Sequence, residues 1–248
     1  MSDLITVQGI VLSAQPVGEY DKRIVLLTRE RGKISAFAKG ARRQNSPFMA
    51  AVNPFVFGNF TLYEGRSSYN LNQVTVTHHF VELAARQPGV YYGYYFLELA
   101  DYFGREGTDE KNMMNLLYLT VKALLNPGID DRLVRCIFEL RTMTEQGLMP
   151  ELFRCVNCGE EIAGKENLFF SQEAHGILDG DCLKKASPGE ARTARRISQV
   201  ALYTMQYIVS SPMTKLYSFT VTDEVLWELE RHIQPYVAGN TDKKFKSL

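Results

Sequence analysis

The first third of the chain alternates apolar and polar residues with the period of two that is typical of β-strands. β-Branched and aromatic residues dominate these runs, and Gly, Pro, Asn or Ser stands in the breaks between them. No helical period separates one run from the next, so the pattern predicts short strands that pair with one another. The predicted strands cover residues 5–12, 23–29, 33–39, 54–63 and 69–78.

Glycines within two of these strands indicate that the sheet is strongly bent. In the fourth predicted strand the parity of the apolar positions changes between Phe57 and Phe60, and a β-bulge at Gly58 would keep both on one face. Gly9 lets the first strand bend into two halves. Short, bent strands without alternating helices predict a closed barrel of the oligonucleotide-binding (OB) type over residues 1–80.

From residue 81 onward the apolar period changes to that of helices, with steps of three and four residues. Thr108 and Thr222, each followed by acidic residues, are helix-capping candidates, and Ser187-Pro188-Gly189-Glu190 has the spacing of a capping box. We therefore expect a multidomain α+β protein in which an all-α domain over residues 81–248 follows the barrel. The predicted helices cover residues 92–103, 108–124, 130 or 131 to 147, 187–208 and 222–233, and Pro235 ends or kinks the last one.

Three of the four cysteines fall in one short window, which indicates a metal site rather than a disulfide scaffold. Cys155 and Cys158 have the spacing of a zinc knuckle, and Gly159 allows the turn to close under the metal. Cys182 follows after 23 intervening residues and supplies a third thiolate. The sequence therefore predicts a zinc-knuckle insertion over residues 151–187.

The fourth ligand of this site is left open by the sequence. Asp179 stands three residues before Cys182, which repeats the spacing of the first cysteine pair, and a carboxylate oxygen binds zinc at about 2.0–2.2 Å. His175 is the competing candidate, and a loop of three thiols without metal is the alternative. Four protein donors leave no position for an activated water, so a zinc ion here is structural. The predicted ligands are Cys155, Cys158, Asp179 and Cys182.

Charge is divided unevenly along a chain whose 28 Lys and Arg balance 28 Asp and Glu. Residues 1–80 carry a net charge of +4 and the remainder carries −4. Exposed arginine binds phosphate oxygens in a fork, so the basic region is a candidate phosphate contact; a solvated charged rim is the alternative. Phe37, Tyr63 and Tyr69 are candidates for base stacking. The candidate DNA-binding residues are Lys22, Arg23, Arg29, Lys33, Lys39, Arg42, Arg43 and Arg66.

No catalytic motif accompanies these features. The sequence lacks G-x-x-x-x-G-K-[ST], G-x-G-x-x-G, H-E-x-x-H and G-x-S-x-G, and none of its histidines begins the H-x-E of the zinc deaminases. The longest apolar stretch, residues 90–100, is too short to span a bilayer, and no apolar signal region follows Met1. We therefore expect a soluble intracellular protein that is not an enzyme.

Several segments resemble the RecO family of recombination mediators in bacterial DNA repair. Residues 18–28, Gly-Glu-Tyr-Asp-Lys-Arg-Ile-Val-Leu-Leu-Thr, are similar to a family run that begins G-E-x-D and ends L-T. Residues 38–43, Ala-Lys-Gly-Ala-Arg-Arg, are similar to the next family block. The cysteine knuckle, residues 169–171 (Phe-Phe-Ser) and residues 246–248 (Lys-Ser-Leu) also stand where the family has them. The resemblance spans nearly the whole chain.

This resemblance implies an amino-terminal OB barrel and a helical domain that carries a zinc insertion. It implies binding of single- and double-stranded DNA and annealing of complementary strands in a cytoplasmic, nucleoid-associated protein. With the partner RecR, such a protein promotes RecA loading onto strands coated by the single-stranded-DNA-binding protein. Family members typically have four cysteines at the metal site, so Asp179 departs from the pattern.

Two other functions remain open at this point. A zinc-stabilised adaptor that contacts only proteins would show no salt-dependent DNA binding, because it makes no phosphate contacts. A metal-dependent nuclease or deaminase that uses the cysteine site would cleave or modify labelled single strands and would lose its activity to a chelator. The missing acid-base partner argues against this second alternative.

Overall fold

The computed structural model describes residues 4–65 and 68–247, which divide into two compact units. The first unit extends to Leu125 and includes the chain end from Phe245, and the second unit spans Asn126–Lys244. The first unit therefore groups the two helices after residue 80 with the strands that precede them. No helix in the described part of the chain is both long and apolar enough to cross a membrane.

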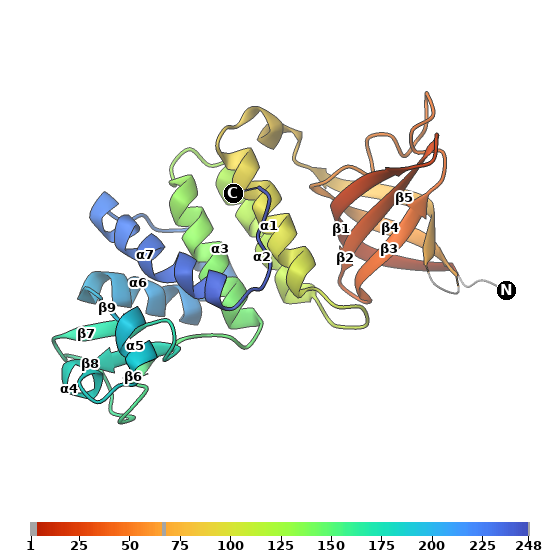
Figure 1. The fold of residues 1–248 in the computed structure, drawn as a ribbon. Helices are drawn as coiled ribbons and strands as arrows, with labels where there is room; N and C mark the ends of the chain where they lie inside the picture. Colours follow the sequence, from red (N-terminus) through yellow and green to blue (C-terminus); the bar gives the residue numbers. More distant parts are fainter. Residues whose placement is uncertain (1–3, 66–67, 248) are drawn as a thin grey trace. The chain divides into compact units, whose positions relative to one another are not determined.

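The strands of the first unit pair in the order β1-β2-β3-β5-β4, and β4 pairs with β1, so that the sheet closes on itself (Figure 1). Neighbouring strands are antiparallel except β3 and β5, which are parallel. The predicted strand-rich, OB-like domain is thereby confirmed. Its strands are β1 (Leu4–Val17), β2 (Asp21–Thr28), β3 (Gly32–Ala38), β4 (Val56–Glu64) and β5 (Tyr69–His79).

β1 is shared between two partners, because its first half pairs with β4 and its second half pairs with β2. Gly9 stands where the two pairings meet and lies opposite Gly58 of β4. A Cβ on Gly9 would lie 2.8 Å from the carbonyl oxygen of Leu27, so only glycine allows this close approach. β1 is longer than predicted, since Pro16 continues the pairing with β2.

The helices of the first unit are the 3₁₀ turn η1 (Val81–Ala85), α1 (Gly89–Phe103) and α2 (Lys111–Leu124). The predicted start of the second helix at Thr108 is wrong. The Thr108 hydroxyl lies within hydrogen-bond distance of the Arg105 carbonyl oxygen and the Glu110 carboxylate, so it does not cap α2. The connection from α1 to α2 instead contacts the β2–β3 turn, where the backbone N–H of Lys33 donates to the Arg105 carbonyl oxygen at 2.8 Å.

The expected bulge in the fourth strand is also corrected by the structure. Phe60 belongs to the buried barrel core, whereas Phe57 packs against Phe80 and against Tyr118 of α2. The change of parity therefore reflects two apolar faces, one toward the barrel interior and one toward the helices. The register of the β4–β5 pair shifts at this point because Thr77 is an extra residue on β5, not on β4.

In the second unit the predicted capping box at Ser187 is present, whereas the side chain of Thr222 makes no capping hydrogen bond at the start of the last helix. The Asp130 side chain accepts the backbone N–H of Arg132, and Ser187 forms a complete capping box with Glu190. α7 continues through Pro235, so of the two predicted effects the proline does not end the helix; buried side chains flank it on both sides. The helices are α3 (Asp131–Glu145), α4 (Gly180–Leu183), α5 (Pro188–Thr193), α6 (Gln199–Ser210), η2 (Met213–Lys215) and α7 (Asp223–Gly239).

A second sheet interrupts these helices, so the predicted all-α domain is a mixed one. Its strands are ordered β6-β8-β7-β9, with β6 and β8 parallel and the other pairs antiparallel. β9 divides the single helix predicted over residues 187–208 into α5 and α6, because its two arginines pair with β7. The strands are β6 (Glu151–Cys155), β7 (Leu168–Ser171), β8 (Gly176–Asp179) and β9 (Arg195–Arg196).

Candidate nucleic-acid interface and metal site

The outer face of the β2–β3 hairpin carries the first group of candidate DNA contacts. Ile24 and Ala36 point into the barrel core, so the alternate residues of both strands face outward. Arg23 lies opposite Phe37, and its Nε donates to the Ser35 hydroxyl at 2.8 Å. A cation thus stands beside a half-exposed aromatic ring on the strands that bind oligonucleotides in OB folds.

The basic loop after β3 is fixed against the β1–β2 turn by hydrogen bonds. The backbone N–H of Gly40 donates to Asp21 Oδ1 at 2.7 Å, and the backbone N–H of Arg42 donates to the Tyr20 carbonyl oxygen at 2.8 Å. The Arg42 guanidinium also donates to the Gly18 carbonyl oxygen at 3.2 Å. Gly18 and Gly40 both adopt positive φ, which glycine supplies without strain. The loop is therefore held in place rather than tethered only at its ends.

Several cations gather where this loop contacts the turn. Lys22 Nζ donates to Asn53 Oδ1 at 2.9 Å, and burial, reinforced by the charge of Arg42, lowers the pKa of Lys22. The Arg43 guanidinium lies over the ring of Tyr20, with its central carbon 5.2 Å from the ring centroid. We call Tyr20, Lys22, Lys39, Arg42 and Arg43 the basic loop surface.

Sequence reasoning missed Tyr20, a residue that is 45% exposed beside these cations. The sequence feature that could have pointed to Tyr20 is its position in the turn directly before Asp21, whose side chain anchors the loop. Tyr69 is buried in the barrel core, so it is not available for the base stacking that the sequence suggested, whereas Tyr63 is exposed. The exposed aromatic ring beside the loop is therefore that of Tyr20.

The other candidate DNA contacts lie apart from the basic loop surface. In the β2–β3 pairing Lys22 lies opposite Ala38, while Lys33 lies opposite Leu27 at the far end of the hairpin. Lys33 forms an ion pair with Asp101 of α1 at 3.4 Å, which neutralises its charge within the chain. Arg29 is exposed at that same end. Arg66 lies outside the described residues.

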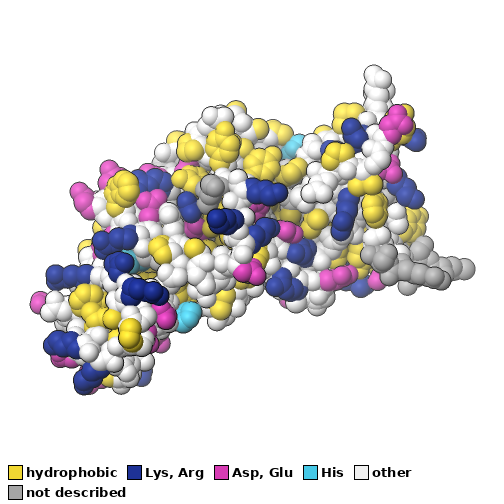
Figure 2. Space-filling view, in the orientation of Figure 1, with side chains coloured by type: hydrophobic (Ala, Val, Ile, Leu, Met, Phe, Trp, Pro, Cys, Tyr) yellow, Lys and Arg dark blue, Asp and Glu magenta, His cyan; other side chains and the backbone are white. Residues whose placement is uncertain are grey.

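The visible surface shows no single continuous basic field. Lys and Arg side chains are interspersed with Asp and Glu over the face of each unit (Figure 2). This distribution agrees with the zero formal net charge of the chain. Any attraction to a polyanion must therefore come from local groups such as the basic loop surface.

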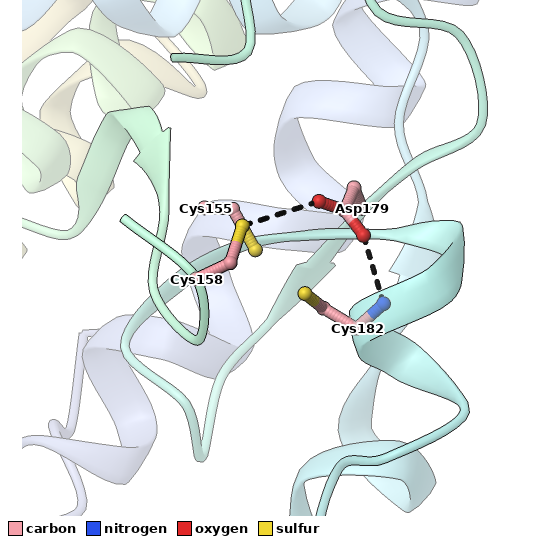
Figure 3. A group of neighbouring side chains, drawn as sticks. All are labelled: Cys155, Cys158, Asp179 and Cys182. Atoms are coloured by element: carbon pink, nitrogen blue, oxygen red, sulfur yellow. Dashed lines mark hydrogen bonds between the residues drawn. The ribbon is translucent and has the colours of Figure 1, made fainter. Parts of the chain in front are cut away.

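The metal-site residues converge from three elements of the second unit. Cys155 ends β6, Cys158 lies in the following turn, Asp179 ends β8 and Cys182 lies on α4. Gly159 has a φ of 74° and its N–H donates to the Cys155 carbonyl oxygen at 2.8 Å, which closes the turn. The ligand atoms of all four side chains lie within 4.8 Å of one another and face a common centre (Figure 3).

This arrangement fits a tetrahedral metal ion. Zinc–sulfur distances of about 2.3 Å at tetrahedral angles place ligand atoms about 3.8 Å apart, so only small movements would complete the shell. Three thiols and one carboxylate are also donors that zinc accepts. His175 stands outside the group, with Nδ1 3.4 Å from the Tyr236 hydroxyl. The structure thus brings together Asp179, and not His175, with the three cysteines.

The electrostatics of the site differ from one ligand to the next. The backbone N–H of Cys182 donates to Asp179 and holds the pKa of that carboxyl well below its usual range. Burial raises the pKa of the Cys182 thiol to about 12. Burial also acts to raise the pKa of Cys155, but backbone hydrogen bonds from Cys158, Asp179 and Asn157 outweigh it and lower the value. Metal binding to this group therefore releases protons.

Comparison with known proteins covers nearly the entire chain. Residues 1–80 match the family model described as Recombination protein O N terminal, and residues 89–248 match Recombination protein O C terminal. The chain belongs to the RecO family. The resemblance seen in the sequence is thereby confirmed, and RecO membership implies a part in recombination repair.

Relatives that carry the name DNA repair protein RecO align with the chain over most of their length. The protein from Alkaliphilus metalliredigens is 30% identical over 246 residues, which cover 99% of this chain and 97% of that protein. The one from Symbiobacterium thermophilum is 30% identical, with coverage of 98% and 95%. The one from Bacillus pumilus is 32% identical, with coverage of 86% and 84%. Both units therefore have counterparts in these RecO proteins.

Proposed function

We propose that this chain is a recombination mediator that binds single- and double-stranded DNA and anneals complementary strands. With RecR, it promotes RecA loading onto strands coated by the single-stranded-DNA-binding protein. RecO membership supports the repair role, and the basic loop surface supports the DNA contact. The chain acts by binding its partners rather than by chemical turnover.

The observation that carries the DNA proposal is the fixed position of the basic loop. Hydrogen bonds to the β1–β2 turn hold Arg42, and the ring of Tyr20 supports Arg43, so both guanidinium groups are ordered before DNA arrives. Preorganised arginine loses little freedom on binding phosphate. Tyr20 adds an exposed ring for base stacking.

The same proposal assigns a structural role to a zinc ion in the second unit. Cys155, Cys158, Asp179 and Cys182 would hold it, and when bound it links β6, β8 and α4. Four protein ligands leave no open position for a substrate or an activated water. This arrangement gives no support to a metal-dependent nuclease or deaminase.

The alternative is a zinc-stabilised adaptor that contacts proteins and not DNA. Large apolar side chains are exposed on α6 and α7, at Val200, Tyr203 and Trp227, and exposed aromatic side chains are common in protein interfaces. Such side chains would serve the contacts of a mediator with its protein partners equally well. DNA binding therefore decides between the two functions.

We would test the DNA contact by measuring affinity for labelled single- and double-stranded oligonucleotides over a salt series. The wild-type chain should show a slope of log K against log salt of about −0.9 for each neutralised phosphate on duplex and about −0.7 on single strands. Replacing Arg42 and Arg43 together with Ala removes two contacts, so the slope should flatten by about 1.8 on duplex and about 1.4 on single strands.

A matched control removes two arginines from the second unit. The double variant Arg192→Ala/Arg195→Ala takes the same charge from α5 and β9, and it should keep the wild-type slope. An equal loss in both variants would mean that overall charge, and not the basic loop surface, drives binding. A wild-type chain that fails to bind at low salt would support the adaptor instead.

A further inference from the structure

Lys165 lies between two carboxylates at the edge of the metal site. Its Nζ is 2.6 Å from Glu160 Oε2 and 3.5 Å from Asp179 Oδ2. Its side chain is 31% exposed and that of Asp179 is 13% exposed, so solvent screens this contact only in part. Lys165 is not a candidate ligand, yet it contacts the one ligand that is not a cysteine.

The Asp179 carboxylate is held at both of its oxygens. Oδ1 accepts the backbone N–H of Cys182 at 2.8 Å, which also caps α4. Oδ2 accepts from Lys165 and lies 3.5 Å from the Cys158 sulfur. Each carboxylate oxygen has two lone pairs, so Oδ2 can accept from Lys165 and still present a lone pair to a metal ion.

Lys165 is itself fixed by the knuckle. The Glu160 side chain binds its ammonium group, and the Glu160 carbonyl oxygen accepts the backbone N–H of Cys155 at 2.9 Å. Glu160 therefore links the lysine to the chain beside the first thiol. Two ion pairs therefore connect Glu160 to Lys165 and Lys165 to the metal-facing carboxylate of Asp179.

Charge favours a cation at this place. Three thiolates and one carboxylate around Zn²⁺ carry a net charge of −2, and an ammonium group next to the carboxylate reduces the repulsion among these ligands. Hydrogen-bonded groups around a metal site also orient its ligands. Both effects act in the same direction, toward tighter metal binding.

We propose that Lys165 is a positioning residue of the metal site, where it orients Asp179 Oδ2 and compensates the charge of the ligand set. The orienting contact is specific to a carboxylate, because Oδ2 accepts a hydrogen bond from Lys165. The inference rests on the proposed metal site. It does not depend on DNA binding.

The test is zinc affinity of the full chain, measured by competition with a chromogenic chelator. Lys165→Gln should lower the zinc association constant by about 10- to 100-fold, the range typical of partners that orient a ligand. Lys165→Arg keeps the charge and the donor and should retain most of the affinity. Glu160→Gln removes the carboxylate that holds the Lys165 ammonium group, and it should lower zinc affinity less than Lys165→Gln does.

Lys184 provides a matched control close to the same site. It pairs with Asp181 on α4 at 2.8 Å and is 76% exposed, so Lys184→Gln removes an equal charge without touching a ligand. This variant should bind zinc with wild-type affinity. A loss as large as that of Lys165→Gln would mean that general electrostatics, not orientation of Asp179, explains the effect.

A double-mutant cycle isolates the contact between Lys165 and the carboxylate. Asp179→Cys supplies a fourth thiolate and leaves the charge of the site unchanged, so in this background Lys165→Gln should lower zinc affinity less than in the wild type, because only the orientation of the carboxylate is no longer lost. The absorption bands of bound Co²⁺ report the ligand set and should shift with Asp179→Cys but not with Lys165→Gln. Circular dichroism of each variant checks that the fold is retained.

The possible outcomes separate the two proposals. A wild-type chain that does not bind zinc would overturn the metal site itself. Zinc binding that is equal in the wild type and Lys165→Gln would overturn only the role of Lys165. Tighter binding by Lys165→Gln would show that the lysine competes with the metal for Oδ2, which also contradicts the inference.

Discussion

His232 on α7 shows how burial changes the chemistry of a single residue. Its side chain is 1% exposed, and its ring packs against Phe170 with 5.5 Å between centroids. Burial, reinforced by the charge of Arg231, lowers its pKa from 6.5 to about 4, while Glu228 at 3.8 Å opposes the shift. His232 is therefore neutral in the folded protein at neutral pH.

This burial predicts a loss of stability in mild acid. Between pH 6.5 and pH 4 the unfolded chain binds a proton at His232 and the folded chain does not. The free energy of unfolding therefore decreases as the pH is lowered through this range, by up to about 3 kcal/mol. Above pH 6.5 His232 is neutral in both states, and the stability of the folded chain is not reduced by its protonation. Urea unfolding followed by the fluorescence of Trp227, the one tryptophan of the sequence, measures it in the second unit.

The variant His232→Gln tests the origin of this effect. Its stability should depend less on pH between 6.5 and 4 than that of the wild type, even if it is less stable at pH 7. Parallel pH profiles for the two proteins would show that His232 takes up its proton in the folded state. Such a result would contradict the expected role of burial.

At the scale of elements, the β2–β3 turn and the α1–α2 connection depend on one another. Gly32 has a φ of 65° and pairs with Glu106 across an isolated bridge. The backbone N–H of Gly107 donates to the Arg31 carbonyl oxygen at 2.9 Å. A Cβ on Gly32 would lie 2.0 Å from the Arg105 carbonyl oxygen, which leaves no room for a side chain.

Gly32→Ala should therefore separate these two elements. The left-handed backbone alone costs about 1–2 kcal/mol for a residue with a Cβ, and the contact with the Arg105 carbonyl oxygen adds to it. Gly107→Ala is the control, because Gly107 also has positive φ but meets no atom within 4 Å of the added Cβ. Urea unfolding followed by near-ultraviolet circular dichroism should show the larger loss for Gly32→Ala. If the two variants lost the same free energy of unfolding, the β2–β3 turn would have to shift away from the Arg105 carbonyl oxygen without cost.

At the scale of the whole molecule, each unit is stabilised in a different way. The first unit closes a barrel around an apolar core, whereas the second unit joins helices to a small sheet, and the metal-site residues lie on two strands of that sheet, in the turn after β6 and on α4. Binding a metal to the folded state alone stabilises the part of the chain that holds it. The two units should therefore respond differently to metal removal.

Hydrogen exchange with and without a chelator tests this difference. At a free zinc concentration about 100 times Kd, binding contributes about 2.7 kcal/mol, so amides of β6, β7 and β8 should exchange up to about 100-fold faster once zinc is removed. Amides of β1 to β4 should keep their rates. Unchanged exchange in β6 to β8 after verified zinc release would exclude a structural role for the metal.

The sequence alone determined those features that depend on neighbours along the chain. The alternation in β2 and β3 and the capping box at Ser187 follow from local backbone chemistry, and the structure has both. The spacing of the cysteines likewise predicted a group of side chains that lie close enough together to hold a metal ion. Each of these signals lies within one element or one short window.

Tertiary structure decided the features that depend on contacts between distant segments. Phe57 faces outward because α2 covers it, and Asp179 rather than His175 joins the thiols because β8 ends beside the knuckle. Likewise Lys33 faces Asp101, and Tyr20 supports the basic loop. The period and spacing of apolar residues show which face of an element is apolar. They do not show which other element covers that face, because packing depends on contacts between segments that are distant in the sequence.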